Sequence, residues 1–243
     1  MRSKARGPAA PTRLHSVRFP GESAAYRAAR DELLRAEMDL RRRLEAVAAM
    51  RRRLPLGGVV PQDYRFEEGA AALDGADTVR DVRLTELFRR GKGSLVVYNF
   101  MYGPDMARPC PMCTAMLDGL NGTAPHAAQR LNLVVVARSP IQRIRAFARE
   151  RGWRHLRLLS SAGNTYNRDY HGEAADGSQR PALNVFARRG RRVHHFYSAE
   201  LLFAPAEPEQ DARHVDLLWP LWSLFDLTPD GRPDWYPALS YRS

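Results

Sequence analysis

The chain has 243 residues, with 38 Lys and Arg against 27 Asp and Glu, and a formal net charge of +11. A hydrophobic content of 44% and a charged content of 27% are ordinary for a globular protein and argue against wholesale disorder. Two cysteines are too few for a disulfide-dense secreted scaffold, and no apolar run approaches the roughly 20 residues of a membrane helix. Because the basic N-terminus also lacks the apolar core of a secretory signal, we expect a cytoplasmic protein with no membrane association.

The N-terminal part of the chain predicts an arm followed by a long helix. Residues 1–20 are rich in Arg and Pro and are typical of a mobile arm. From Ser23 to about Arg53 there is no Pro or Gly, and Ala, Leu, Arg and Glu dominate, which favours a helix. An apolar stripe recurs every seven residues along it, at Leu33, Leu40, Val47 and Leu54. The helix therefore packs on its own domain or forms a homodimer through this stripe.

Pro55 and the glycines that follow it end this helix, so we divide the chain into an arm over 1–20, a helical extension over 21–55 and a main domain over 56–243. The main domain opens with a short edge strand at 63–66, a strand at 77–83 and a helical turn at 85–90.

Buried strands and helices then alternate along the chain. We predict strands at 94–102, 131–137 and 157–160, helices at 113–120 (continued or restarted over 125–130) and 141–151, a hairpin of strands at 182–188 and 192–197, and a terminal helix at 215–227. Apolar strands that alternate with helices indicate an α/β fold with a partly parallel sheet, and the hairpin makes the sheet mixed.

The two cysteines lie together in the motif Cys110-Pro111-Met112-Cys113. The motif follows a strong strand and a short loop and opens a helix, which is the pattern of a thioredoxin-like redox site. A helix N-terminus stabilises a thiolate, so we expect Cys110 to be the nucleophile and Cys113 to be the protonated, resolving thiol. Pro111 suits the first helical position, and Arg108 adds positive charge nearby.

A second segment supports this interpretation. Pro181 begins a predicted strand that is followed by a glycine turn and another strand, which resembles the thioredoxin segment whose cis-proline faces the cysteines. We expect a cis Arg180–Pro181 bond that presents backbone groups to an extended substrate and keeps metals from the thiols. The alternative is an ordinary trans proline at the start of a strand.

The chain resembles the thioredoxin-like bacterial proteins of domain-of-unknown-function family 899 over about residues 20–240. The resemblance is carried by the runs 95–105, 110–113, 118–122, 134–140, 152–153, 160–161, 166–170, 195–198 and 226–232. It implies a thioredoxin-like mixed sheet flanked by helices, an N-terminal helical extension and a thiol site at Cys110 and Cys113. A peroxiredoxin normally has Thr three residues before its reactive cysteine, whereas this chain has Ala107.

Other residues near the motif have two interpretations each. Tyr102 either borders the site or packs in the core. Asp105 and Asp118 either exchange a proton with Cys113 or serve as a loop cap and a solvated helix face, respectively, and the second interpretation is favoured. The polar loop at 167–170 either lines the substrate cleft or is solvent-exposed.

We expect no metal and no cofactor. A zinc site at the two cysteines would need two more ligands, and no second pair with ligand spacing is present. The adjacent His194 and His195 point to opposite faces of a strand and cannot chelate one ion. Arginine runs at 41–43, 51–53 and 188–192 come without a nucleic-acid-binding motif, so nucleic-acid binding is not expected.

The sequence therefore predicts a thiol–disulfide oxidoreductase that acts on a disulfide-bearing protein or a small thiol substrate. An electron donor, which the sequence does not identify, would return it to the reduced state. One alternative is a peroxiredoxin-like peroxidase. The other is a redox-sensing module whose dithiol switches a conformation while the N-terminal helix binds another chain.

Overall fold

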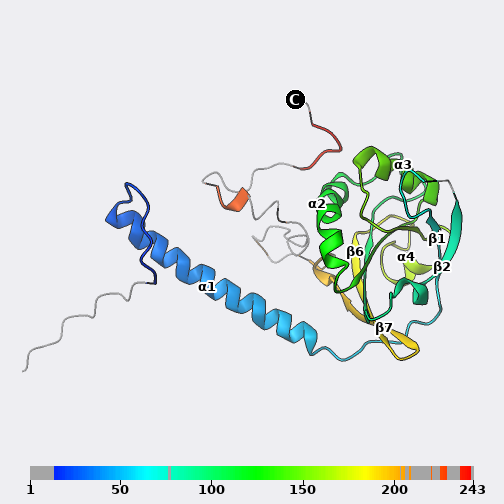
Figure 1. Ribbon diagram of the computed structural model, residues 1–243, viewed down its shortest axis with the longest axis horizontal. Helices are drawn as coiled ribbons and strands as arrows, with labels where there is room; N and C mark the ends of the chain where they lie inside the picture. Colours follow the sequence, from blue (N-terminus) through cyan, green and yellow to red (C-terminus); the bar gives the residue numbers. More distant parts are fainter. Residues whose placement is uncertain are drawn as a thin grey trace, which may run out of the picture. The chain divides into compact units, whose positions relative to one another are not determined.

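The computed structural model describes residues 14–75, 78–202, 204–205, 208, 220, 225–228 and 236–241. It forms two compact units, Met1–Leu54 and Pro55–Ser243 (Figure 1). Most of the predicted arm and most of the terminal helix predicted at 215–227 lie outside the described residues.

The first unit is built around helix α1 (Ala24–Arg52). Ser23 caps the helix by accepting a hydrogen bond from the backbone N–H of Tyr26 at 3.1 Å. No residue of α1 is buried, and its apolar stripe is exposed at Leu33, Leu40, Leu44, Val47 and Met50. The prediction of a long amphipathic helix is confirmed, whereas a homodimer formed through the stripe stays a prediction.

The second unit contains a seven-stranded mixed sheet with the strand order β2-β1-β5-β4-β3-β6-β7. The strands are β1 (Arg65–Gly69), β2 (Val79–Arg83), β3 (Ser94–Asn99), β4 (Asn132–Ala137), β5 (Leu158–Ser160), β6 (Ala182–Arg189) and β7 (Arg192–Ser198). β3 is parallel to β4 and antiparallel to β6, and β6 is antiparallel to β7. This order and direction around a β3-helix-β4 crossover is a thioredoxin-like arrangement, so the predicted fold class is confirmed.

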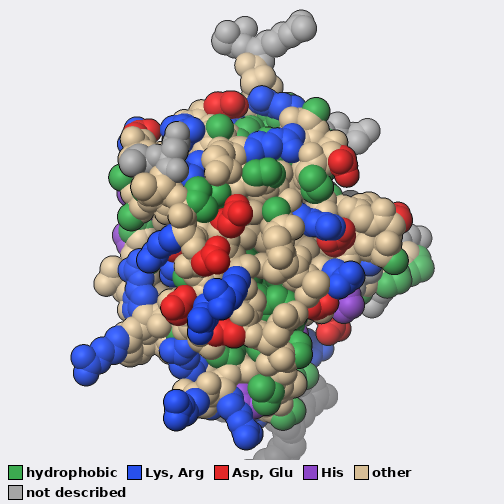
Figure 2. Space-filling model, turned by 90° about the vertical axis from the view of Figure 1, so that its right-hand side faces the viewer, with side chains coloured by type: hydrophobic (Ala, Val, Ile, Leu, Met, Phe, Trp, Pro, Cys, Tyr) green, Lys and Arg blue, Asp and Glu red, His purple; other side chains and the backbone are tan. Residues whose placement is uncertain are grey.

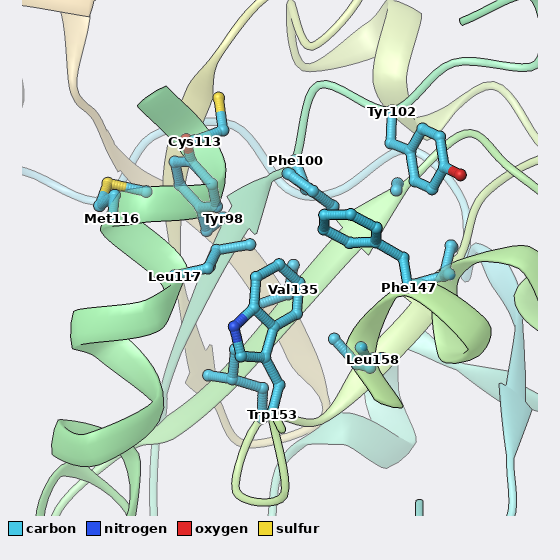
Figure 3. Close-up of a cluster of buried hydrophobic side chains, with 14 of the residues drawn as sticks. Tyr98, Phe100, Tyr102, Cys113, Met116, Leu117, Val135, Phe147, Trp153 and Leu158 are labelled. Atoms are coloured by element: carbon cyan, nitrogen blue, oxygen red, sulfur yellow. The ribbon is translucent and has the colours of Figure 1, made fainter. Parts of the chain in front are cut away.

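Both faces of the sheet are buried, which explains the nearly continuous apolar strands. Along β3, alternate side chains enter different clusters, with Leu95 and Val97 on one face and Tyr98 on the other. Helices α2 (Pro111–Ala127) and α3 (Ile141–Arg151) cover the face of Tyr98. Figure 3 shows Met116 and Leu117 of α2 and Phe147 of α3 in one buried hydrophobic cluster. Trp153, which follows α3, belongs to the same cluster.

The opposite face of the sheet is covered by a short 3-10 helix (Leu84–Leu87) and by helix α4 (Tyr166–Asp169). Aromatic rings fill the space beneath α4. Tyr166 packs edge-on against Tyr64 and Phe66, with ring centroids 5.6 Å and 5.3 Å apart. The two clusters together enclose the sheet in a three-layer domain.

Three predicted elements differ from the structure. The strand predicted at 63–66 is β1 at Arg65–Gly69, and it is an inner strand that pairs with both β2 and β5, because Phe66 and Glu68 are buried. The helix predicted at 113–120, continued or restarted over 125–130, is the single longer helix α2, because Pro125 lies in its last turn, where its missing N–H removes a single bond. The polar loop predicted at 167–170 is largely the helix α4.

The predicted hairpin is confirmed as β6 and β7. Gly190 opens the two-residue turn with a φ of +58°, a left-handed conformation that favours glycine. Among the helices that the structure describes, none combines the length and the apolar character needed to cross a lipid bilayer.

Candidate dithiol site

The two cysteines lie at the start of helix α2, at the end of the loop that follows β3. The backbone N–H of Cys110 donates to the carbonyl of Met101 at 3.1 Å, which closes the loop. Cys110 is the N-cap, with an extended ψ of 125°, and Pro111 is the first helical residue, as predicted. The Cys110 sulfur therefore lies where the unpaired N–H groups of the helix converge.

Cys110 has the surroundings of a stabilised thiolate. Its Sγ accepts a hydrogen bond from the backbone N–H of Cys113, with an N···S distance of 3.5 Å. A hydrogen bond from the Cys113 thiol outweighs the opposing effect of partial burial and, with the Cys113 and Met112 amides, lowers the pKa of Cys110 to about 6. The thiol is half-buried, so it remains accessible. At neutral pH it is mainly ionised and nucleophilic.

Cys113 has the opposite character although it lies one helical turn away. It is only 4% exposed, and both cysteines are free. Its hydrogen bond to Cys110 and its burial raise the pKa of Cys113 well above the usual range. Figure 3 shows its side chain beside Tyr98 and Met116. The structure thus brings the two thiols together, with the pKa lowered at Cys110 and raised at Cys113.

A guanidinium group organises the loop that carries Cys110. Arg143 of α3 donates to the carbonyls of Gly103 (3.3 Å), Pro104 (3.0 Å) and Ala107 (3.3 Å), and also to that of Met106. The hydroxyl of buried Ser139 donates to the carbonyls of Tyr102 at 2.9 Å and Gly103 at 3.1 Å. These bonds fix the loop, because its carbonyls gain side-chain donors and Arg143 supplies charged ones.

Sequence reasoning missed this role of Arg143. An arginine on the polar face of a helix resembles any other in a chain in which Lys and Arg number 38. Only the packing of α3 against the loop distinguishes it. The guanidinium also lies over the ring of Tyr102, 4.4 Å from the ring centroid.

Tyr102 belongs to the core. It is 5% exposed, and its ring packs edge-on against Phe100 and Phe147, with centroids 5.8 Å and 5.9 Å away. In Figure 3 it lies across the aromatic group from Cys113. Its contacts support the packing interpretation, and it positions the loop through Arg143 rather than bordering the thiols.

The charged residues predicted beside the motif lie in different surroundings. Asp105 is exposed in the loop. Arg108 forms an ion pair with Glu150 at 3.6 Å and lies over the ring of Phe147, so its charge is directed to α3 and is not among the main causes of the low pKa of Cys110.

Asp118 is a structural anchor, and the favoured interpretation as a solvated helix face was wrong. Its Oδ1 accepts hydrogen bonds from Trp153 at 2.8 Å and from Arg151 at 3.2 Å. The indole and the guanidinium tie α2 to the end of α3, because each is a fixed donor that a carboxylate can satisfy at once.

Pro181 lies beside the end of β3, because the next residue, Ala182, pairs with Asn99. The prediction of a cis Arg180–Pro181 bond was wrong, because the described residues contain no cis peptide bond. Pro181 directly precedes β6, and the Arg180 N–H donates to the carbonyl of Gly172 at 3.0 Å. At this position the missing N–H of proline interrupts no strand pairing.

A tyrosine near the C-terminal end of the chain borders the site, and sequence reasoning missed it. The hydroxyl of Tyr236 lies 4.0 Å from the Sγ of Cys110. It is also one of the groups that lower the pKa of Cys110. The only sequence signal is an aromatic residue before a proline, 126 positions away from the cysteine.

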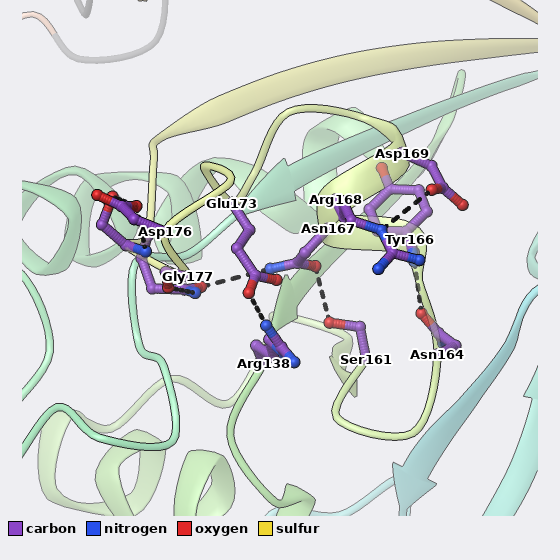
Figure 4. Close-up of polar contacts among 12 residues, drawn as sticks. Arg138, Ser161, Asn164, Tyr166, Asn167, Arg168, Asp169, Glu173, Asp176 and Gly177 are labelled. Atoms are coloured by element: carbon purple, nitrogen blue, oxygen red, sulfur yellow. Dashed lines mark hydrogen bonds and ion pairs between the residues drawn. The ribbon is translucent and has the colours of Figure 1, made fainter.

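The segment after β5 is buried in part: Ser161 and Asn167 form a buried polar cluster, whereas Arg168 and Asp169 are exposed. Asn167 is 2% exposed and accepts hydrogen bonds from Ser161 at 2.7 Å and from Asn99 at 3.3 Å. Figure 4 shows this contact, together with the ion pair between Arg138 and Glu173. Because Asn99 is the last residue of β3, the cluster supports the strand that leads to the cysteines.

The two adjacent histidines have separate partners. His195 Nε2 lies 3.0 Å from the Oδ1 of Asn184, whereas His194 Nδ1 lies 3.1 Å from the carbonyl of Gly57. Across the described part of the chain, no group of three or more His, Cys, Asp or Glu side chains is arranged to hold a metal ion.

Much of the arginine charge on one edge of the domain is paired. Figure 2 shows Lys and Arg side chains interspersed with Asp and Glu on the face that it displays. Glu68 lines a cavity of about 430 Å³ and bonds Arg80 at 2.7 Å and Arg157 at 2.6 Å. Burial opposes ionisation of this carboxyl, but the two guanidiniums lower the pKa of Glu68. None of the residues that line this cavity belongs to α2 or to the loop at 101–109 that leads to Cys110.

Comparison with known proteins identifies a family. The model of the family described as "Bacterial protein of unknown function (DUF899)" matches residues 16–242. The chain therefore belongs to this family, and the predicted membership is confirmed. No curated protein gives a significant match.

Solved structures that resemble the chain include AhpC from Enterococcus faecalis, at 13% identity and a TM-score of 0.44, covering 71% of this chain and 93% of that protein. Thioredoxin peroxidase I from Plasmodium yoelii matches at 15% identity and a TM-score of 0.45, and the match covers 78% of this chain and 100% of that protein. Peroxidoxin BcpB from Mycobacterium tuberculosis matches at 20% identity and a TM-score of 0.42, and the match covers 68% of this chain and 94% of that protein.

Proposed function

We propose that this protein is a thiol–disulfide oxidoreductase in which Cys110 attacks and Cys113 resolves. One observation carries the proposal: the Cys110 thiolate caps a helix and is hydrogen-bonded to the buried, protonated Cys113. A thiolate with a pKa slightly below neutral combines a high ionised fraction with useful nucleophilicity. The substrate is a disulfide-bearing protein or a small disulfide.

The reaction proceeds in two exchange steps. The Cys110 thiolate attacks one sulfur of the substrate disulfide, forming a mixed disulfide and releasing the other substrate sulfur as a thiolate, which takes a proton from water. Cys113 then loses its proton and attacks the Cys110 sulfur, which releases the second substrate thiolate. The substrate gains two electrons and the protein keeps a Cys110–Cys113 disulfide. An external dithiol must reduce that disulfide to start another cycle.

The proposed cycle uses the contrast between the two thiols. Once Cys110 is bound in the mixed disulfide, it no longer carries the negative charge that raises the pKa of Cys113. The pKa of Cys113 should then fall, so the resolving thiol becomes ionised only when it is needed. Thr114 keeps the turn in place, because its hydroxyl donates to the Cys110 carbonyl at 2.9 Å.

The experiment is the reduction of a model protein disulfide, such as insulin, by the wild type and by two variants. Cys110→Ser should lose the activity by at least about a hundredfold, because the thiol that remains, Cys113, is buried and has a raised pKa. Cys113→Ser should also lose turnover but should accumulate a mixed disulfide with the substrate, visible by mass spectrometry. Each variant is the control for the other, since both remove one sulfur from the same turn. A Cys110→Ser variant with wild-type turnover contradicts the proposal.

Two alternatives give different results in the same assays. A peroxidase would consume hydrogen peroxide rapidly and form a sulfenic acid on Cys110. Ala107 disfavours this reaction, because its methyl group cannot hydrogen-bond a peroxide and its carbonyl is occupied by Arg143. A redox-sensing module would show neither activity, and its oligomeric state would change on oxidation.

A further inference from the structure

The segment from Tyr236 to Tyr241, here called the strap, is held on the second unit near the dithiol. Arg151 Nη1 donates to the carbonyl of Leu239 at 2.8 Å. Pro237 is buried, and Leu239 packs against the core cluster that contains Cys113. Within the strap, the Ala238 N–H donates to the hydroxyl of Tyr241 at 3.3 Å. The strap therefore has both polar and apolar attachments to the domain.

One side chain links the strap to the helix that carries the thiols. Arg151, at the end of α3, bonds Asp118 of α2 as well as the strap. The distance from Tyr236 to Cys110 is thus set by a chain of fixed contacts that runs from α2 through Arg151 to Leu239. Without these contacts, the position of Tyr236 relative to the Cys110 sulfur would not be fixed.

We propose that Tyr236 is a further catalytic residue, whose hydroxyl donates a hydrogen bond to the Cys110 thiolate. The hydroxyl and the sulfur are 4.0 Å apart, and Tyr236 itself is 56% exposed, so its side chain meets both the thiol and the solvent. This inference rests on the proposed function, because it assigns a role within the same thiol exchange. The donor adds to the two that Cys113 supplies from within the helix.

The protonation state of Tyr236 suits a permanent donor. Partial burial and the neighbouring Cys110 charge raise the pKa of Tyr236 above its usual range. The hydroxyl therefore keeps its proton throughout the pH range in which Cys110 ionises. Its role is to stabilise charge on the sulfur, not to transfer its proton to the substrate.

Charge on Cys110 matters most when the oxidised protein is reduced. The donor dithiol attacks the Cys110 sulfur and displaces Cys113, and its second thiol then attacks the donor sulfur of the mixed disulfide. Cys110 leaves in that step as a thiolate, while the donor becomes a disulfide. A hydrogen bond to the departing sulfur stabilises it. Loss of the Tyr236 hydroxyl should therefore slow regeneration and favour the disulfide form at equilibrium.

The test is Tyr236→Phe, which removes the hydroxyl and keeps the ring. The ultraviolet absorbance of the thiolate, followed against pH, should give a Cys110 midpoint that is higher by about half to one pH unit. The alkylation rate below neutral pH should fall by about threefold, in proportion to the thiolate fraction. In a glutathione redox buffer, the equilibrium constant for forming the Cys110–Cys113 disulfide, obtained from the oxidised fraction, should be about threefold larger for Tyr236→Phe than for the wild type. Tyr26→Phe on helix α1 is the control for loss of one phenol hydroxyl.

The outcome separates this inference from the proposed function, because the titration needs no substrate. If Tyr236→Phe titrates as the wild type does while the wild type reduces disulfides, the role of Tyr236 is refuted and the function stands. If the midpoint rises in Tyr236→Phe while the wild type reduces no disulfide, the hydrogen bond stands and the function is refuted. A shift of the same size in Tyr26→Phe also overturns the inference, because the effect would then not come from the Cys110 contact.

Discussion

Two segments border Cys110, and they are attached to the domain very differently. The loop at 101–109 is held by side-chain donors from one helix and its preceding turn: Arg143 bonds four of its carbonyls and Ser139 bonds two. Among the described residues, the strap at 236–241 accepts a bond from Arg151 at the Leu239 carbonyl and adds the packing of Pro237 and Leu239. The loop is therefore part of the fold, whereas the strap is an attachment to it.

The difference matches the roles that we assign to the two segments. The loop must hold the nucleophile at the helix N-terminus, and a rigid loop keeps the thiolate aligned with its donors without a cost at each turnover. The strap lies on the solvent side of the same sulfur, where a protein disulfide must approach. The strap's described contacts, at Arg151, Pro237 and Leu239, place the Tyr236 hydroxyl at that sulfur.

The largest expected effect comes from removing the loop's main donor. Arg143→Met should lower the free energy of unfolding by about 3 kcal/mol, because several carbonyls lose a charged donor and Tyr102 loses its cation contact. Urea unfolding measures it. Arg149→Met on the same helix is the matched control, since within the described part of the chain its guanidinium makes only an exposed bond to the Leu73 carbonyl at 3.3 Å, and it should cost less than about 0.5 kcal/mol. Equal losses in the two variants would show that the loop is not specially anchored.

This contrast also marks what the sequence could predict. The segments of one strand and one helix were predictable, because the nearly continuous apolar run along 94–99 follows from burial of a strand on both faces, and the spacing along 141–151 from burial of one helix face. The dithiol was predictable because the chemistry of Cys-x-x-Cys is local, and its helix start fixes which sulfur is exposed. Asp118, Arg143 and Tyr236 act through partners at least 33 positions away, and a single side chain carries no periodic signal for such contacts.

The failed predictions have the same origin. Asn167 was expected in a polar loop, but its amide is buried among Asn99 and Ser161, partners that only the tertiary fold supplies. The conformation of Pro181 depends on the strand that it enters, which adjoins the end of β3. The conformational propensity of a few residues predicts a helix or a strand, whereas the surroundings of the residues at its ends are set by other helices and strands.

The next effect concerns pH and tests the part of the site that the loop holds. The pKa of Cys110 is lowered to about 6 in the folded protein, whereas an unfolded cysteine has a pKa of about 8.5. Folding then stabilises the thiolate, so this contribution is fully present above about pH 8.5 and is lost as the pH falls through about 6. Under reducing conditions, the unfolding free energy of the wild type relative to Cys110→Ser should rise by up to about 3 kcal/mol across this window, because each pKa unit of difference corresponds to about 1.4 kcal/mol.

Cys113→Ser serves as the control for that pH dependence. The hydrogen bond from the Cys113 thiol is the largest cause of the low pKa of Cys110, so its replacement by a hydroxyl should move the window. Above about pH 8.5 the wild type should gain no more, because the raised pKa of Cys113 opposes ionisation of that thiol in the fold. A pH-independent difference between the wild type and Cys110→Ser would show that the thiolate is not stabilised by folding.

The smallest expected effect on stability comes from the strap. Leu239→Ala removes part of its apolar attachment and should lower the free energy of unfolding by about 1 kcal/mol, because the side chain is only partly buried. Its effect at the thiol should be larger than its effect on stability. Once the strap is loosened, a bulky maleimide should alkylate Cys110 faster relative to small iodoacetamide, since the ring of Tyr236 no longer stands over the sulfur.

Leu201→Ala is the control for this last variant, because Leu201 is 65% exposed and the substitution removes a leucine of the same size. It should leave both the stability and the ratio of the two alkylation rates unchanged. If Leu239→Ala instead unfolds as easily as Arg143→Met, the strap is as much a part of the fold as the loop. If it loses about 1 kcal/mol and the ratio does not move, the strap is attached where expected but does not cover the thiol. Only a small loss of stability with a raised ratio fits a removable cover over a fixed nucleophile.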